Sequence, residues 1–225
     1  MPAFTFRVES LIAAGIILLV SFPVHEFAHA FAAYRLGDGT AKMFGRLTLN
    51  PIAHFDPVGG LLLLASSLTG FGIGWAKPTP VNPINLRGGS GSEGVVAFAG
   101  PAANLVLAAA GAIPARLLIA AGRNGVDVPE IVVQVLAYFV LINVALMIFN
   151  LIPIPPLDGS KVLFSFMNPR TVWQVRPILE QYGLILLLFV AFVPILPGQN
   201  TVFSFVFEKA GIPIVNFLLG DVFFL

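Results

Sequence analysis

Cysteine is absent from the 225-residue chain, and charged residues make up only 10% of it. Without cysteine the chain can form no disulfide and can offer no thiolate ligand to a metal ion. The formal net charge is +1, so there is no strongly basic surface, and we expect no nucleic-acid partner. A soluble domain needs more charge than this to cover its surface. The scarcity of charge therefore argues against a soluble protein.

Hydrophobic residues make up 57% of the chain, and its mean hydropathy is +0.93. A run of roughly 20 apolar residues is long enough to cross a bilayer as a helix. We therefore predict an all-α, multi-pass integral membrane protein, embedded in the lipid bilayer, with about five to six membrane helices. The predicted spans are 10–34, 93–121, 130–152 and 178–196, followed by an apolar tail, 201–225, that is broken at Gly211 and Pro213.

The chain has no linker long enough to separate a second domain, so we expect residues 1–225 to form a single membrane-embedded domain. Its core is expected within 10–170, with accessory helices in 171–225. After the first span comes an apolar but short and glycine-rich patch, 57–75. Prolines at 78, 80 and 83 then forbid a helix and favour extended backbone.

The first span contains ionisable side chains, in the stretch SFPVHEFAHAFAAY at 21–34. His25 and His29 lie one turn apart on one helical face, and Glu26 lies within the same arc. In this HExxH arrangement two imidazoles bind one zinc ion, and the glutamate acts on the water that zinc polarises. HExxH also occurs by chance. Because charged groups at mid-bilayer cost roughly 2.5–3.5 kcal/mol each, which a bound cation offsets, the membrane setting favours a metal site.

A catalytic zinc ion usually has three protein ligands and one open position. Asp158 follows the sequence PIPP, which must interrupt a helix, and irregular backbone survives at membrane depth only where it faces protein or a wet cavity. We favour Asp158 as the third ligand. Capping of a helix that begins near Gly159 is the alternative, and both can hold because a carboxylate has two oxygens. His54 is the other candidate ligand, although the prolines that bracket it favour a turn near the surface.

Three motifs together resemble the site-2 proteases, a family of zinc metalloproteases that cut within membranes. HEFAH at 25–29 is similar to the family's HExxH, GPAAN at 100–104 to its Gly-Pro-x-x-Asn element, and NLIPIPPLDG at 150–159 to its second signature. They occur in the family's order, and GWAKPTPVNP at 74–83 also resembles a family segment. The chain has no room for the PDZ or CBS domains of some members, so it resembles a compact form.

The resemblance implies a zinc-dependent endopeptidase that hydrolyses peptide bonds in or near the transmembrane segments of membrane proteins. His25, His29 and Asp158 would hold one Zn²⁺ ion. Glu26 would act as the general base and then carry the proton to the leaving amine. Asn150 would face the scissile peptide, where an amide is a suitable donor because it is neutral and needs no counter-ion. The alternative for Asn150 is to cap the helix that ends there.

Asn104 is a candidate for contact with the substrate. It lies among small residues that allow helices to approach closely, so a hydrogen bond between helices is the favoured interpretation. Lysines and arginines are spread along the chain and indicate no orientation. The resemblance implies a location in the cell membrane, with the active site nearer the cytosolic side.

The ligands of one ion must lie at one depth, which constrains the topology. His25 lies late in the first span and Asp158 lies just after the span 130–152, so the two meet only if those spans are parallel. Parallel spans need an odd number of crossings between them, and 93–121 supplies one. We therefore predict that 57–75 enters the membrane and returns, or lies at its surface. The extended stretch 74–86 could pair with a substrate as an added strand, or be an ordinary surface loop.

Two other functions compete with proteolysis. Membrane histidines and carboxylates also form ion pathways, as in a metal-ion transporter, but these would place polar groups along several spans. Here they cluster beside a glutamate at catalytic spacing. A non-catalytic membrane binding protein would usually lack the glutamate or a ligand, and this chain has them all. The resemblance implies that transmembrane proteins are the substrates.

Overall fold

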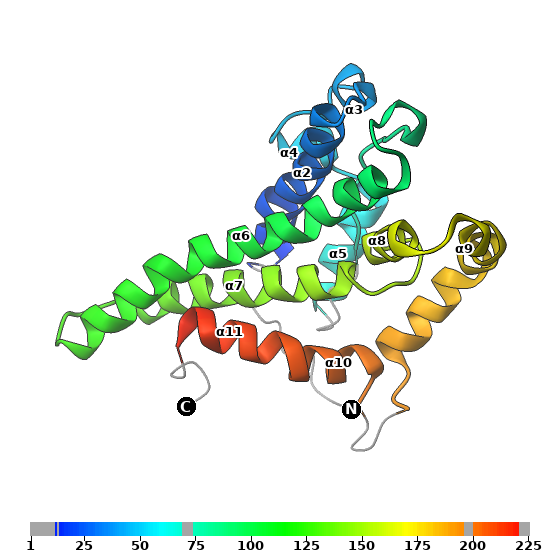
Figure 1. The fold of residues 1–225 in the computed structure, drawn as a ribbon. Coiled ribbons are helices and arrows are strands. Elements are labelled where there is room, and N and C mark those ends of the chain that lie inside the picture. The colour runs from blue at the N-terminus through cyan, green and yellow to red at the C-terminus, as the bar shows by residue number, and fades with distance from the viewer. Residues whose placement is uncertain (1–11, 13, 69–73, 196–199, 221–225) are drawn as a thin grey trace.

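A computed structural model describes residues 12, 14–68, 74–195 and 200–220 of the chain. The elements of this described part are helices (Figure 1). Five of them are long and apolar enough to cross a membrane, namely 14–35, 89–123, 130–150, 169–192 and 202–219. The prediction of an all-α, multi-pass membrane protein is thereby confirmed.

The elements follow one another with short connections, except between the first two long helices. In chain order they are η1 (Ile17–Ser21), α2 (Phe22–Arg35), α3 (Thr40–Met43), α4 (Pro51–His54), α5 (Pro57–Leu68), η2 (Pro83–Asn85), α6 (Gly89–Arg123), α7 (Glu130–Asn150), α8 (Asp158–Phe166), α9 (Pro169–Phe192), α10 (Val202–Val206), η3 (Phe207–Gly211) and α11 (Ile212–Leu219).

Two of the long helices contain a π-helical turn just before a proline. The turn η1 precedes Pro23, and η3 precedes Pro213. A proline offers no N–H to the carbonyl four residues earlier, and its ring crowds that carbonyl, so a wider turn relieves the conflict. The apolar tail therefore remains one continuous helix, 202–219, where its glycine and proline led us to expect a break.

Helices α2, α6 and α7 form the centre of the fold, where α6 and α7 lie side by side and α2 stands at a steep angle to them (Figure 1). Along α2 and α6, His29 meets Val96 whereas His25 meets Asn104, so these two helices are antiparallel. Asn104 likewise meets Asn143 of α7, while Gly111 of α6 faces the earlier Phe139. Two antiparallel pairs make α2 and α7 parallel, as the depth argument requires.

The connection 36–88 begins and ends at the same end of this bundle. Its last part is tied back to α2 by a hydrogen bond from the Arg87 N–H to the Leu36 carbonyl, at 2.8 Å. Its apolar helix α5 has 12 residues and is about 18 Å long, which is too short for a hydrocarbon core of about 30 Å. The predicted patch 57–75 therefore makes no net crossing, although its residues 69–73 lie outside the described part.

The stretch 74–82 forms no helix, as predicted, and lies against α2 and its neighbours. It is shorter than the extended stretch 74–86 that we predicted, because Pro83–Asn85 form the 3-10 turn η2. The Lys77 N–H donates to the His54 carbonyl at 2.8 Å, and the Thr79 N–H donates to the Glu26 carboxylate at 2.7 Å. The Asn82 N–H donates to the Asp38 carboxylate at 2.7 Å. These contacts hold the extended stretch beside the face of α2 that carries the histidines and Glu26.

Asp38 is fully buried and holds this arrangement together. Its carboxylate accepts hydrogen bonds from the backbone and hydroxyl of Thr40, from the Asn82 backbone and from the Asn85 side chain, at 2.5–3.1 Å. Burial alone would raise the pKa of Asp38, but these hydrogen bonds outweigh it and lower the pKa below its ordinary value. The ionised carboxylate therefore stabilises the contact between the end of α2 and the segment 82–85.

We predict that Asp38→Asn loosens residues 74–88. One acceptor oxygen becomes a donor, so backbone hydrogen exchange there should be about tenfold to hundredfold faster, equivalent to roughly 1.5–3 kcal/mol. Because the folded-state pKa is lowered, wild-type protection should persist above the ordinary carboxyl pKa of about 3.9 and fall as the pH drops through the folded value. Asp127→Asn, at an exposed site, is the control. Equal exchange in wild type and Asp38→Asn would contradict the prediction.

Candidate metal centre

Three side chains from distant parts of the chain converge on one point. The Nε2 atoms of His25 and His29 are 3.0 Å apart, and each is 3.1 Å from Oδ2 of Asp158. Ligands about 2.0–2.1 Å from a tetrahedral zinc ion lie about 3.3 Å from one another, so one ion fits among these atoms. The three residues are 7–9% exposed. This is the set of ligands that we predicted from the sequence.

The break between α7 and α8 brings Asp158 to the histidines. Asp158 is the first residue of α8, and Oδ2 of its side chain faces the two histidines of α2. The next residue must be glycine for this packing. A Cβ on Gly159 would lie 2.2 Å from the carbonyl oxygen of Leu151, in the turn that ends α7. The start of α8 therefore packs directly on that turn.

The outer nitrogens of both histidines face hydrogen-bond acceptors. Nδ1 of His29 lies 2.7 Å from the Val96 carbonyl oxygen, and Nδ1 of His25 lies 2.6 Å from Oδ1 of Asn104. Each Nδ1 must therefore carry a proton, so in the neutral imidazole the lone pair lies on Nε2. Two such nitrogens and a carboxylate oxygen repel one another at 3.0–3.1 Å unless a cation, either a proton or a metal ion, lies between them. This donor set of two imidazoles and one carboxylate suits zinc.

Gly100, the first residue of the GPAAN motif, borders the same point. A Cβ on this glycine would lie 2.4 Å from Nε2 of His29 and 2.6 Å from Nε2 of His25. Glycine therefore keeps the space beside the two ligand atoms open. In the sequence Gly100 is only one of several small residues on this helix, so its particular role there became visible only in three dimensions.

Glu26 faces the extended stretch rather than the neighbouring helices. Its Oε2 accepts the Thr79 N–H at 2.7 Å, and its backbone carbonyl accepts the Thr79 hydroxyl at 3.0 Å. No pattern in the sequence indicated this pairing, since Thr79 lies 53 residues further along the chain. The candidate general base is thus held by a backbone donor from the connection 36–88.

The other candidate residues lie in different settings. Asn150 is partly buried, and its side-chain N–H₂ donates to the Leu146 carbonyl, one turn back in α7, at 2.9 Å. Asn104 has no exposed surface and bonds to both His25 and Asn143, so it is placed for hydrogen bonds between helices and not for contact with a substrate.

His54 differs from our expectation of a turn near the surface. It is 1% exposed, and its Nε2 donates to the Thr48 carbonyl at 2.8 Å. It does not belong to the group of His25, His29 and Asp158, whose positions among the described residues would allow them to hold a metal ion.

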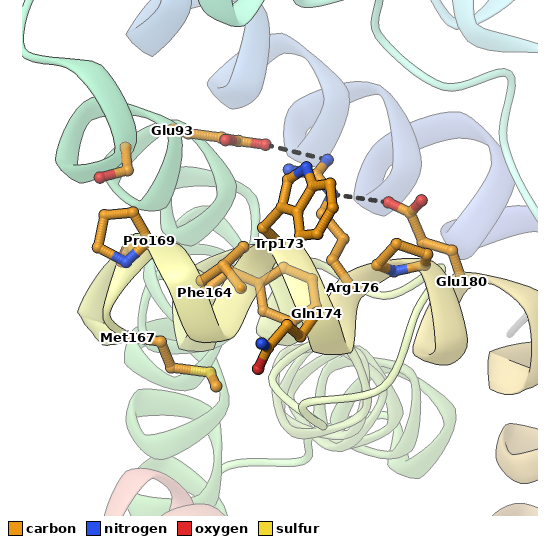
Figure 2. A pocket seen from close by; sticks show the side chains of 12 residues that line it. Glu93, Phe164, Met167, Pro169, Trp173, Gln174, Arg176 and Glu180 are labelled. Carbon is orange, nitrogen blue, oxygen red and sulfur yellow. Dashed lines mark hydrogen bonds and ion pairs between the residues drawn. The ribbon is translucent and has the colours of Figure 1, made fainter.

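A cavity of about 590 Å³ lies on another side of α8, between the first turns of α6 and α9 (Figure 2). Arg176 is 3.5 Å from Glu93 and 2.8 Å from Glu180, and its guanidinium lies 5.7 Å from the centre of the Phe164 ring. These contacts join α6, α8 and α9. None of the candidate site residues lines the cavity, so it is separate from the metal centre.

A multi-helix membrane protein with a buried His–His–Asp cluster beside a glutamate belongs to the class of membrane metalloenzymes. Comparison with known proteins defines it further. The profile of Peptidase family M50 matches residues 116–193.

Several curated relatives match most of the chain. It is 38% identical over 187 residues to "Putative zinc metalloprotease YwhC" of Bacillus subtilis, and the match covers 80% of each chain. It is 35% identical over 182 residues to "Putative zinc metalloprotease Rip2" of Mycolicibacterium smegmatis, covering 79% of this chain and 66% of the relative. The same-named protein of Mycobacterium tuberculosis is 33% identical over 200 residues, with 85% and 73% covered. No solved structure gives a significant match.

This chain therefore belongs to Peptidase family M50, the site-2 protease family, and it is a zinc metalloprotease. The family resemblance that we drew from three short motifs is confirmed.

We predict that Gly100→Ala prevents zinc binding, because the added methyl group would lie within 2.6 Å of both Nε2 atoms. Metal content of the purified protein, measured by mass spectrometry, should fall from about one zinc ion per chain to near zero. Gly122→Ala is a matched control on the same helix, since a Cβ there meets only Val128 at 4.0 Å. Full zinc content in Gly100→Ala would show that the ion does not sit between these histidines.

Proposed function

We propose that this zinc metalloprotease is an intramembrane endopeptidase that cleaves peptide bonds in or near the transmembrane segments of membrane proteins. The observation that carries this proposal is the depth of the metal centre. His25 lies 10 residues before Arg35, where the first span ends, and 11 after Ala14, from which the structure describes that span without a gap. At 1.5 Å per residue it is about 15 Å from the Arg35 end and at least as far from the other end. A peptide bond that reaches this depth belongs most naturally to a membrane-spanning segment.

In this proposal His25, His29 and Asp158 hold the zinc ion. Bound zinc supplies polarisation of a water molecule and of the scissile carbonyl. Glu26 takes a proton from the attacking water and passes it to the leaving nitrogen as the C–N bond breaks. The Thr79 N–H holds one oxygen of Glu26, so the other is available to accept the proton.

Asn150 is proposed to steady the oxyanion that forms on the scissile carbonyl. One N–H of its side-chain amide is used by the Leu146 carbonyl, and an amide nitrogen carries a second N–H. A neutral donor suits this position because it needs no counter-ion inside the membrane. The contact with Leu146 also fixes the direction of the amide before substrate arrives.

The extended stretch 74–82 is proposed to receive the unwound substrate as an added strand. Its Lys77 and Thr79 N–H groups point toward α4 and α2 and are already bonded. The opposite edge carries Pro78 and Pro80, which offer carbonyls but no N–H. A substrate strand could therefore donate its N–H groups to these two carbonyls, but its own carbonyls would find no N–H donor there. Only half of the hydrogen bonds of an ordinary β-ladder would form.

We further propose that the protein lies in the cell membrane and that the end of the bundle where α2 ends and α6 begins faces the cytosol. We call this the metal end, because α7 also ends there and leads to Asp158. The connection 36–88, at that end, contains Lys42, Arg46, Lys77 and Arg87, whereas the other end has Arg123 in the last turn of α6 and no basic residue in the connection 124–129. Cytoplasmic connections carry the excess of lysine and arginine in membrane proteins. The helix directions support this orientation, because they group these four basic residues at one end of the bundle.

We expect Glu26→Gln to retain zinc and to lose cleavage by about 10²- to 10⁴-fold, because Gln cannot accept the proton from water. The measurement combines zinc content with cleavage of a panel of single-span membrane proteins co-expressed with each variant. Glu130→Gln, at the exposed start of α7, serves as the control. Wild-type cleavage by Glu26→Gln would end the proposal.

Orientation is testable by cysteine labelling, since the natural chain has no cysteine to give background. Single cysteines would replace Met43, which is 82% exposed near the metal end, and Val126, which is 57% exposed at the other end. In intact cells a membrane-impermeant maleimide should label Val126→Cys and leave Met43→Cys unmodified until the cells are lysed. The reverse pattern would place the metal end outside the cytosol.

A further inference from the structure

We propose that Asn143 of α7 is a positioning residue that fixes which nitrogen of His25 faces the metal ion, acting through Asn104 of α6. The inference rests on the proposed role of His25 as a zinc ligand and extends the site to a third helix. Neither Asn143 nor its contact with the site is marked by any of the motifs in the sequence.

The evidence is a chain of three hydrogen bonds that crosses the bundle. Nδ1 of His25 lies 2.6 Å from Oδ1 of Asn104. The Asn104 amide N–H₂ donates to Oδ1 of Asn143 at 3.0 Å, and the Asn143 amide N–H₂ donates to the Phe139 carbonyl at 2.9 Å. Both asparagines have no exposed surface, so water cannot replace either partner.

The Phe139 carbonyl, at the end of this series of hydrogen bonds, determines which group donates and which accepts in each of them. A backbone carbonyl can only accept, so Asn143 must turn its N–H₂ toward Phe139 and its oxygen toward Asn104. Asn104 must then turn its own N–H₂ toward Asn143 and its oxygen toward His25. The His25 Nδ1 must donate to that oxygen, and its Nε2 is left with the free lone pair that binds metal.

Without Asn143 this direction is lost. The two ends of the Asn104 amide are nearly equal in size, so the group could turn its N–H₂ toward His25. The imidazole would then accept at Nδ1 and carry its proton on Nε2, where the proton blocks metal binding. Asn143 removes that second arrangement, because in it two acceptors or two donors would face each other in a buried, low-dielectric setting.

The position of Asn143 is otherwise unfavourable for an amide. Its neighbours on α7, Val140 and Val144, have no exposed surface and belong to the apolar core shared with α6 and α11. A buried amide in such surroundings costs free energy unless its hydrogen bonds are complete. The cost is offset here by bonds that end at the metal centre.

The first test measures zinc affinity of the full chain in detergent, by competition with a fluorescent zinc chelator. Asn143→Leu keeps the approximate volume and removes both hydrogen bonds. We expect zinc binding about 10- to 100-fold weaker than in wild type. Val140→Ala, one turn away, perturbs the packing of α7 without touching the chain of bonds and should keep wild-type affinity. Wild-type affinity in a folded Asn143→Leu would overturn the inference.

Two further variants distinguish a role of Asn143 in orienting His25 from a general effect of its substitution on the structure. Asn143→Thr has a hydroxyl that can donate to the Phe139 carbonyl and accept from Asn104, so it should keep most of the zinc affinity. Asn104→Asp places a carboxylate next to His25, and both of its oxygens accept. In that background Asn143 is no longer needed to set direction, so adding N143L should weaken zinc binding no further, within about threefold. A further loss as large as in the single Asn143→Leu variant would contradict the proposal.

A second measurement reads the His25 proton directly. The chain has three histidines, so ¹⁵N-histidine labelling of metal-free protein gives few signals, and each nitrogen reports whether it carries the proton. In wild type the His25 Nδ1 should be protonated, whereas Asn143→Leu should show a mixture of the two forms. If wild type itself binds no zinc, the proposed function fails. If it binds zinc and the variants behave like wild type, only this inference fails.

Discussion

The mutual repulsion of three lone-pair donors is the constraint on which this structure depends. His25, His29 and Asp158 present acceptor atoms 3.0–3.1 Å apart, and Asn104 and Val96 hold the two imidazoles in this direction through their Nδ1 atoms. Such an arrangement is unfavourable in isolation and stable around a cation. The packing of α2, α6 and α8 brings these atoms together, so an ion bound among them would be part of the fold as well as part of the chemistry.

The helix topology supplies the common depth that a shared ion demands. The connection after α2 turns back without crossing, so that α7 runs parallel to α2 and delivers α8 at the level of His25. Two glycines then allow the final approach: Gly100 leaves room beside the imidazoles, and Gly159 lets the start of α8 rest on the backbone of the preceding turn. The directions of the helices and the close contacts at these two glycines thus both help to bring the same three candidate ligand atoms together.

Local patterns in the sequence were sufficient to predict the helices that carry the site and the three candidate ligands. The histidines follow from helical spacing, and Asp158 follows from a helix that prolines must break at membrane depth. The parallel relation of α2 and α7 followed from the shared ion. The contacts of Glu26 with Thr79 and of Asn104 with Asn143 could not be found in this way. They join residues 53 and 39 positions apart, and no periodicity connects them. The π-helical turns were also missed, since they depend on how each helix accommodates one proline.

The prolines of the extended stretch have a consequence for self-association. A bare strand edge invites pairing with another copy of the same chain, because each copy can exchange donors and acceptors with the next. Pro78 and Pro80 remove the donors from one edge, and the bonds of Lys77 and Thr79 occupy those of the other. Two copies of the chain therefore cannot join these stretches into a continuous sheet, because neither has N–H groups here to donate to the other. Only a different strand, with N–H groups of its own, could pair with the carbonyls of Pro78 and Pro80.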